Sequence, residues 1–240
     1  MVVSPAKHSV LSTLQAAGQP VELGVEVALA RVILIMSPDP SSPSGVTLDW
    51  RAELPTLTSR TLTLREPVAQ DLGALIDLLS IGDASHFGLD YPITDVAVQQ
   101  FIEHTSRARQ AGQSFTYVIT HGAGRPLVGA IQVRQLDPAF EAAEWEATLQ
   151  PSARGTGVFL DAARLVGSFA FGPVGTHRLE ARVLLQNGRA NGALRKLGAV
   201  QEGVLRRSVR RGTDYLDQVL WSVLKEDWTE HWVSTVPRVH

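Results

Sequence analysis

The fold of this chain is decided by Gln150-Pro-Ser-Ala-Arg-Gly-Thr-Gly-Val158, a turn that follows a strand-like segment and leads directly into an amphipathic one. The start of a helix leaves about four backbone N–H groups without partners, together with about half a positive charge, so a turn that gathers them can bind a diphosphate. Gly155 and Gly157 lack the Cβ atoms that would block such an approach, and they permit a positive φ. The stretch therefore predicts a phosphate-binding turn, with a plain structural turn as the alternative.

The residues after this turn have the pattern of an amphipathic helix over 158–171. Apolar side chains recur at helical spacing, Asp161, Arg164 and Ser168 form a polar stripe, and Gly172-Pro173 ends the segment. Similar patterns predict strands over 60–65, 115–120, 127–135, 144–149, 178–185, 204–210 and 216–224, and helices over 68–79, from 94 or 95, and over 188–197. This order of elements predicts a mixed, mostly antiparallel sheet with helices on both faces.

Short motifs on both sides of the turn resemble those of the GNAT family of N-acetyltransferases, in particular its Rim-type branch of ribosomal-protein acetyltransferases. The turn fits five of six positions of that family's pyrophosphate-binding pattern, which is Arg or Gln, two free positions, Gly, one free position, then Gly or Ala. Phe159 departs from the last position. The other matching segments are 57–65, 176–182, Asn187, 194–198, 202–206, Gly212, Asp217 and 226–228, so the resemblance covers about residues 56 to 228.

The resemblance implies a GNAT fold of the α/β (α+β) class, with a sheet of about six to seven strands. It also implies an acyltransferase that moves an acetyl group from acetyl-CoA, its co-substrate, to a primary amine on a protein N-terminus or a small molecule, in the cytoplasm. An antibiotic acetyltransferase would differ only in its acceptor. The alternative is a catalytically weak or silent acetyl-CoA-binding module that acts as a sensor or interaction partner.

Composition is consistent with one core and excludes several chemistries. The 240 residues are 44% hydrophobic and carry a formal charge of −2, which allows one substantial core with an appendage. The absence of cysteine excludes a disulfide scaffold, a thiolate zinc site and a cysteine nucleophile. The seven histidines include no pair at ligand spacing, so no metal is expected.

We expect three regions: an N-terminal appendage with a Pro/Ser-rich linker over 1–55, the catalytic domain over 56–228, and a C-terminal tail over 229–240. The apolar run Val21–Met36 contains charged residues, is too short to cross a bilayer comfortably and lacks the pattern of a secretory signal, so no membrane partner is expected. If this run is ordered, the sheet or a second copy in a homodimer would cover it. Met36, beside the linker Ser37–Gly45, is a candidate translation start.

Acetyl transfer to an amine requires a group that takes a proton from the attacking nitrogen. Glu144 and Glu146 are the first candidates because, two positions apart on the strand before the turn, they share one of its faces. Glu144 matches a position at which Rim-type relatives carry an acidic residue, and Glu180 matches a carboxylate position of a related ribosomal acetyltransferase. The alternative is that these carboxylates pair with the arginines of neighbouring strands (Arg134, Arg178, Arg182).

The resemblance assigns binding of the cofactor to Leu149, Arg154, Gly155, Thr156, Gly157, Val158, Phe159 and Asn187. Backbone N–H groups near Leu149 would polarise the thioester carbonyl, and Asn187 would contact CoA, with a helix N-cap as its structural alternative. The usual proton donor to the thiolate is missing, because Ala190 stands where the branch has Ser, and Arg195 where other members have Tyr. The thiolate, with a pKa of about 8.5, would leave unaided, through water, or with help from Ser208 or Tyr215.

Two further segments bear on the acceptor. Arg206-Arg-Ser-Val-Arg-Arg-Gly212 has four arginines in six positions, but the slightly acidic chain favours a solvated hairpin tip over a nucleic-acid site. These arginines could also favour acidic peptides or ribosomal surfaces. The segment 86–92 lies between the first two helices, where the family shapes its acceptor pocket, so we expect it to contribute to specificity.

Overall fold

The computed structural model describes residues 49–81, 87, 89 and 92–228. The predictions for the run Val21–Met36, the linker, the Met36 start and the tail 229–240 lie outside the described residues, as does most of the segment 86–92. No helix in the described part of the chain is long and apolar enough to cross a membrane.

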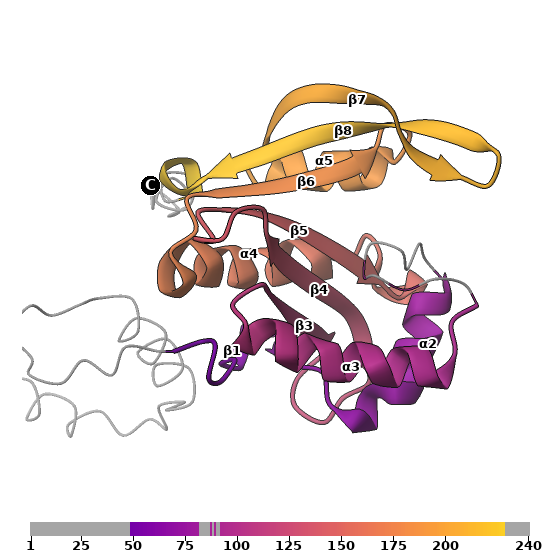
Figure 1. Cartoon of the computed structure of the whole chain (residues 1–240), viewed down its shortest axis with the longest axis vertical. Coiled ribbons are helices and arrows are strands. Elements are labelled where there is room, and N and C mark those ends of the chain that lie inside the picture. Colours follow the sequence, from indigo (N-terminus) through magenta and orange to yellow (C-terminus); the bar gives the residue numbers. More distant parts are fainter. Residues whose placement is uncertain (1–48, 82–86, 88, 90–91, 229–240) are drawn as a thin grey trace, which may run out of the picture. The chain divides into compact units, whose positions relative to one another are not determined.

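Eight strands form one sheet in the order β1-β2-β3-β4-β5-β6-β8-β7 (Figure 1). They are β1 Leu57–Thr58, β2 Thr63–Arg65, β3 Ser114–Thr120, β4 Leu127–Gln135, β5 Ala142–Leu149, β6 Arg178–Leu184, β7 Val200–Arg211 and β8 Asp214–Leu224. All neighbours are antiparallel except β5 and β6, so the predicted mixed, mostly antiparallel sheet is confirmed. The sheet has eight strands rather than the expected six to seven, because Ser59 Oγ accepts the N–H of Leu62 in a turn that separates β1 from β2.

Helices cover both faces of the sheet, as predicted (Figure 1). On one face, α2 Leu72–Ile81 and α3 Asp95–Gln110 pack through residues such as Leu75 and Phe101 against Val118 and Ala130 of β3 and β4. On the other face, α4 Val158–Phe169 and α5 Gly188–Lys196 belong to the larger core, together with Phe115 and Trp145. Strands β3 and β4 therefore contribute alternate side chains to two apolar layers.

Strands β5 and β6 separate after a short paired segment. Their parallel register joins Ala142–Glu144 to Arg178–Glu180, and the remaining halves of the two strands are not paired with each other. Figure 1 shows the strands diverging from this segment. Since side chains alternate along both strands, Trp145 and Ala181 lie on the α4 face, whereas Glu146 and Arg182 lie on the opposite one. The sheet thus has an opening at which groups from its two faces can meet.

Candidate active site

A pocket of about 260 Å³ lies at the opening between β5 and β6. The α4/α5 face contributes Trp145, Ala181 and Val183, with Phe159, Ala190 and Leu194 from the helices. The α2/α3 face contributes Glu146, Thr148, Arg182, Leu184 and Phe87, with Val209, Arg211, Leu216 and Gln218 from the β7–β8 hairpin. The pocket therefore connects the two faces, and one ligand can enter from each.

The predicted phosphate turn precedes α4, whose second residue, Phe159, lines this pocket. Gly155 and Gly157 have φ values of 82° and 95°, and a Cβ added at either would meet nothing within 4 Å. The turn is held by two hydrogen bonds, from Arg154 Nε to the Leu149 carbonyl (3.0 Å) and from Thr156 Oγ1 to the Ala153 carbonyl (2.7 Å). In the described part of the chain the backbone N–H groups of residues 155–159 have no acceptor. An exposed turn with these free donors fits a diphosphate.

Leu149 ends β5 beside the opening. The next residue, Gln150, donates its N–H to the Val128 carbonyl of β4 at 2.9 Å. Because successive N–H groups of a strand point to opposite sides, the N–H of Leu149 points away from β4 and toward β6. Gly129, opposite Leu149 in β4, permits this close approach, since a Cβ there would lie 2.4 Å from Leu149 Cδ2 and 2.8 Å from the Thr148 carbonyl oxygen. A backbone donor is therefore directed at the opening.

The remaining predicted cofactor residues differ in their surroundings. Val158 is buried in the core beneath the turn, whereas Phe159, which departs from the family pattern, lines the pocket. Asn187 also lines the pocket, and its Oδ1 accepts the N–H of Ala190 at 3.1 Å as the N-cap of α5. The structural role of Asn187 as a cap is confirmed, and its contact with CoA stays a prediction.

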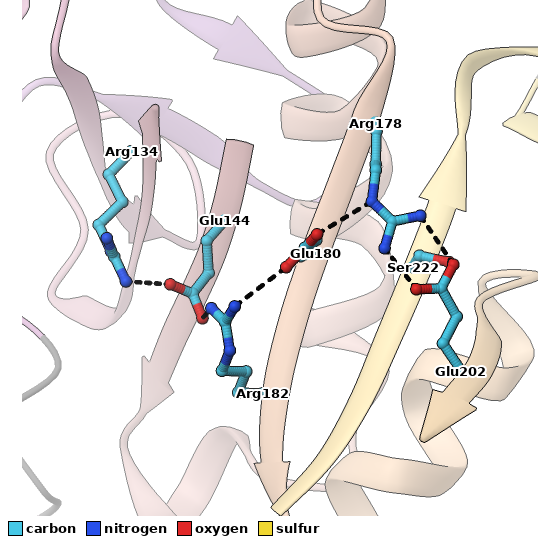
Figure 2. A network of polar contacts seen from close by, with 7 residues as sticks. All are labelled: Arg134, Glu144, Arg178, Glu180, Arg182, Glu202 and Ser222. Atoms are coloured by element: carbon cyan, nitrogen blue, oxygen red, sulfur yellow. Dashed lines mark hydrogen bonds and ion pairs between the residues drawn. The ribbon is translucent and has the colours of Figure 1, made fainter. Parts of the chain in front are cut away.

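Glu144, the first candidate for the base, is held in ion pairs. Its side chain is 2% exposed and does not line the pocket. Oε2 accepts a hydrogen bond from Arg134 Nη2, and Oε1 accepts one from Arg182 Nη1 at 2.5 Å (Figure 2). Guanidinium groups thus bind both carboxylate oxygens. Glu144 therefore has the arrangement of the alternative prediction, in which it pairs with arginines of neighbouring strands.

Glu180 belongs to the same network (Figure 2). It accepts hydrogen bonds from Arg178 Nε at 3.0 Å and from Arg182 Nη2 at 3.2 Å. Arg178 also donates to both oxygens of Glu202, at 2.7 and 2.5 Å. These bonds, with one from Ser222, lower the pKa of Glu202 to about 2 and raise the pKa of Arg178 above its usual value. The network contains three carboxylates and three guanidinium groups, so its formal charges cancel.

Glu146 has a different position from the other two carboxylates. It is half-buried, lies opposite Gln132 of β4, and lines the pocket. Among the described lining residues it is the only carboxylate, accompanied by the cations Arg182 and Arg211. Of the three predicted carboxylates, Glu146 therefore lies at the opening, and Glu144 and Glu180 lie beside it in the ion-pair network.

The two predicted substitutes for a general acid do not line the pocket. Ser208 Oγ donates to Gln218 Oε1 at 2.9 Å, and Tyr215 is 58% exposed. Two polar residues that were not predicted do line it, namely Thr148 and Gln218. Thr148 lies two positions after Glu146 and so shares its face of β5, which was the available signal for Thr148, whereas no local pattern marked Gln218. No group of His, Asp or Glu side chains in the described ranges could hold a metal ion.

Asn191 was also not predicted, and it fixes the corner where β6 meets α5. Its Nδ2 donates to the carbonyls of Leu184 (3.1 Å) and Asn187 (2.9 Å), and its Oδ1 accepts the indole N–H of Trp221 at 2.8 Å. These bonds position the end of β6 and the α5 cap, which form one wall of the pocket.

A family model described as "Acetyltransferase (GNAT) domain" matches residues 61–200, which is more than half of the chain. The chain therefore belongs to the GNAT family and is an acetyl-CoA-dependent acetyltransferase. The predicted family, fold and enzyme class are confirmed.

Individual relatives are similar at low sequence identity. The Bacillus subtilis protein named "Probable N-acetyltransferase YjcK" is 26% identical over 139 residues, which cover 58% of this chain and 76% of that protein. Mycobacterium smegmatis RimJ in complex with CoA-disulfide is 20% identical with a TM-score of 0.62, covering 72% of this chain and 88% of that one. The ribosomal-protein-S5-alanine acetyltransferase from Vibrio fischeri is 17% identical with a TM-score of 0.62, covering 72% and 98%. The two structural likenesses concern the fold alone.

Proposed function

We propose that the chain is an N-acetyltransferase that acetylates a primary amine, on a protein N-terminus or a small molecule, in the pocket at the β5–β6 opening. The proposal rests on the groups that the two faces of the sheet present at this opening. On the α4/α5 face, Phe159 lines the pocket and belongs to the turn whose N–H groups at residues 155–159 have no acceptor among the described residues; on the other face, the carboxylate of Glu146 lines the pocket.

On the α4/α5 face, the turn 154–159 binds the pyrophosphate of CoA through its N–H groups and the positive end of α4. Acetyl-CoA supplies an activated acetyl thioester. The backbone N–H of Leu149 donates a hydrogen bond to the thioester carbonyl oxygen as negative charge develops there. Asn187 contacts CoA from the start of α5, and Phe159 packs beside it in the pocket.

On the α2/α3 face, Glu146 accepts the proton of the incoming amine, directly or through one water, so that neutral nitrogen can attack the carbonyl carbon. Glu144 and Glu180 do not perform this step, because guanidinium groups already bind their oxygens. The C–N bond forms and the C–S bond breaks, and the second proton that the nitrogen loses passes through water to the leaving thiolate, since Ser208 and Tyr215 lie outside the pocket.

A thiol-release assay with peptide N-termini and polyamines, beside calorimetry with acetyl-CoA, tests the proposal. We expect saturable heat with acetyl-CoA and thiol release with at least one amine. Binding without turnover over the whole panel would instead support a silent acetyl-CoA-binding module. An absence of binding by folded protein would refute the role given to the turn.

A further inference from the structure

The β7–β8 hairpin extends beyond the end of β6 and forms one wall of the pocket. The β6–β8 register ends with Leu184 opposite Gln218, whereas β8 begins at Asp214 and β7 ends at Arg211 (Figure 1). Directly opposite residues of antiparallel strands share a face, so Arg211, Gln218 and Leu184 lie on the same face as Glu146. The wall is therefore on the side where the amine enters.

The charges within the pocket are unequally compensated. Arg182 is bound by Glu144 and Glu180. Arg211, by contrast, has no carboxylate oxygen within 4.0 Å in the described ranges, although Asp214 is opposite it in the hairpin register. Gln218 adds a neutral donor, because Ser208 binds its Oε1 and its Nε2 has no acceptor among the described residues.

The excess of positive charge continues along the hairpin outside the pocket. Arg206, Arg207 and Arg210 are exposed on β7. The hairpin has three carboxylates: Asp214 and Asp217 lie near these arginines, and Asp217 already accepts the N–H of Arg207 at 2.7 Å, whereas Glu202 lies toward the other end of β7 and is bound by Arg178. A strand segment from residue 206 to 211 extends for roughly 15 Å. A ligand that contacts both ends must be longer than a free amino acid.

We infer that the acceptor is a polypeptide whose N-terminal amine is followed by acidic residues, with Arg211 as the residue that selects it. This inference rests on the proposed function. The amine meets Glu146, the nearest acidic side chain meets Arg211 and Gln218, and the following ones pass the exposed Arg206 and Arg207. A polyamine gains the contact with Glu146 but meets repulsion from Arg211.

Four acceptors test the inference: three peptides with a common N-terminal alanine and acidic, neutral or basic residues after it, and free glutamate. For the wild-type protein we expect kcat/KM to be highest for the acidic peptide, with free glutamate at least about tenfold lower. The preference should shrink as ionic strength rises, because exposed charges are screened. Equal kcat/KM for the acidic and basic peptides, or for free glutamate and the acidic peptide, would overturn the inference.

The informative variant is Arg211→Gln, with Arg60→Gln as the matched control. Arg60 is exposed in the turn between β1 and β2, at the other end of the strand order. Arg211→Gln should lower kcat/KM about tenfold or more for the acidic peptide and by a smaller factor for the neutral peptide. An equal effect of both variants would contradict the role of Arg211.

A binding measurement separates failure of this inference from failure of the proposed function. Fluorescence anisotropy with labelled acidic and basic peptides, in the presence of CoA, does not require turnover. Selective binding of the acidic peptide that is lost in Arg211→Gln supports the inference even if no acetyl transfer is detected. Non-selective binding overturns it even if transfer occurs.

Discussion

The main effect of replacing Glu144 with glutamine should be a lower free energy of unfolding rather than a lower kcat. The carboxylate is 2% exposed and binds two guanidinium groups, and removing one partner of a buried ion pair costs about 3–5 kcal/mol. Glutamine keeps one acceptor oxygen, and the side chains of Arg134 and Arg182, 47% and 31% exposed, can be rehydrated. We therefore expect the free energy of unfolding to fall by about 2–3 kcal/mol and the Tm by about 4–12 °C.

The matched variant is Glu146→Gln, the same chemical change two residues further along the same strand face. Because Glu146 lies at the pocket, this variant should lose about 10²–10⁴-fold in kcat, with its Tm and its Kd for acetyl-CoA close to those of the wild-type protein. Thermal and urea unfolding measure stability, and thiol release measures the rate. The reasoning is refuted if Glu144→Gln keeps its stability but loses this factor in kcat while Glu146→Gln remains active.

Three further predictions concern the turn before α4, the carboxylate of Glu202 and the contact of Gly129 with β5. Gly157→Ala and Gly212→Ala both place a Cβ at positive φ (95° and 62°) in open space and should cost about 1–2 kcal/mol each, but only the former should raise the Kd for acetyl-CoA in calorimetry, about tenfold. The pKa of Glu202 is lowered to about 2 by Arg178, so its stabilisation is present above about pH 4.5 and lost as the pH falls toward 2. In Glu202→Gln, the free energy of unfolding measured with urea should fall less over this pH range than in the wild-type protein, by about 1 kcal/mol or less. An unchanged dependence of this free energy on pH would contradict the prediction. Gly129→Ala should reduce both Tm and kcat, because its Cβ would lie 2.8 Å from the backbone of β5, and an unperturbed variant would show that this approach is not required.

The conformation of the turn over 154–158 was predictable because its determinants are local. The positive φ values of Gly155 and Gly157 and the start of α4 at Val158 depend on residues a few positions apart. The same holds for β4, whose predicted bounds 127–135 are those observed, and for Thr94, whose Oγ1 caps α3 by accepting the N–H of Ala97. The sequence predicted that the helix starting at Val158 continues to Phe171. In the structure α4 ends at Phe169, and a π-helical turn over 170–174 follows, which contains Pro173; proline cannot donate a helical hydrogen bond.

The choice among the carboxylates was not predictable in the same way. Period-two alternation places Glu144 and Glu146 on one face and gives no reason to separate them. They differ because β5 and β6 part after Glu144, and because Arg182, 38 positions later, binds Glu144 at 2.5 Å. Neither fact is contained in the spacing of residues along β5.

By itself, the sequence determined the order of the elements and the conformation of the turn over 154–158, because glycine conformations, helix starts and alternating patterns depend on neighbouring residues, and its motifs indicated the family by resemblance. Only the tertiary structure decided which carboxylate lines the pocket and which guanidinium group there has no carboxylate partner among the residues that the structure describes. Those properties depend on where distant strands separate and on which opposite charges they bring within hydrogen-bonding distance.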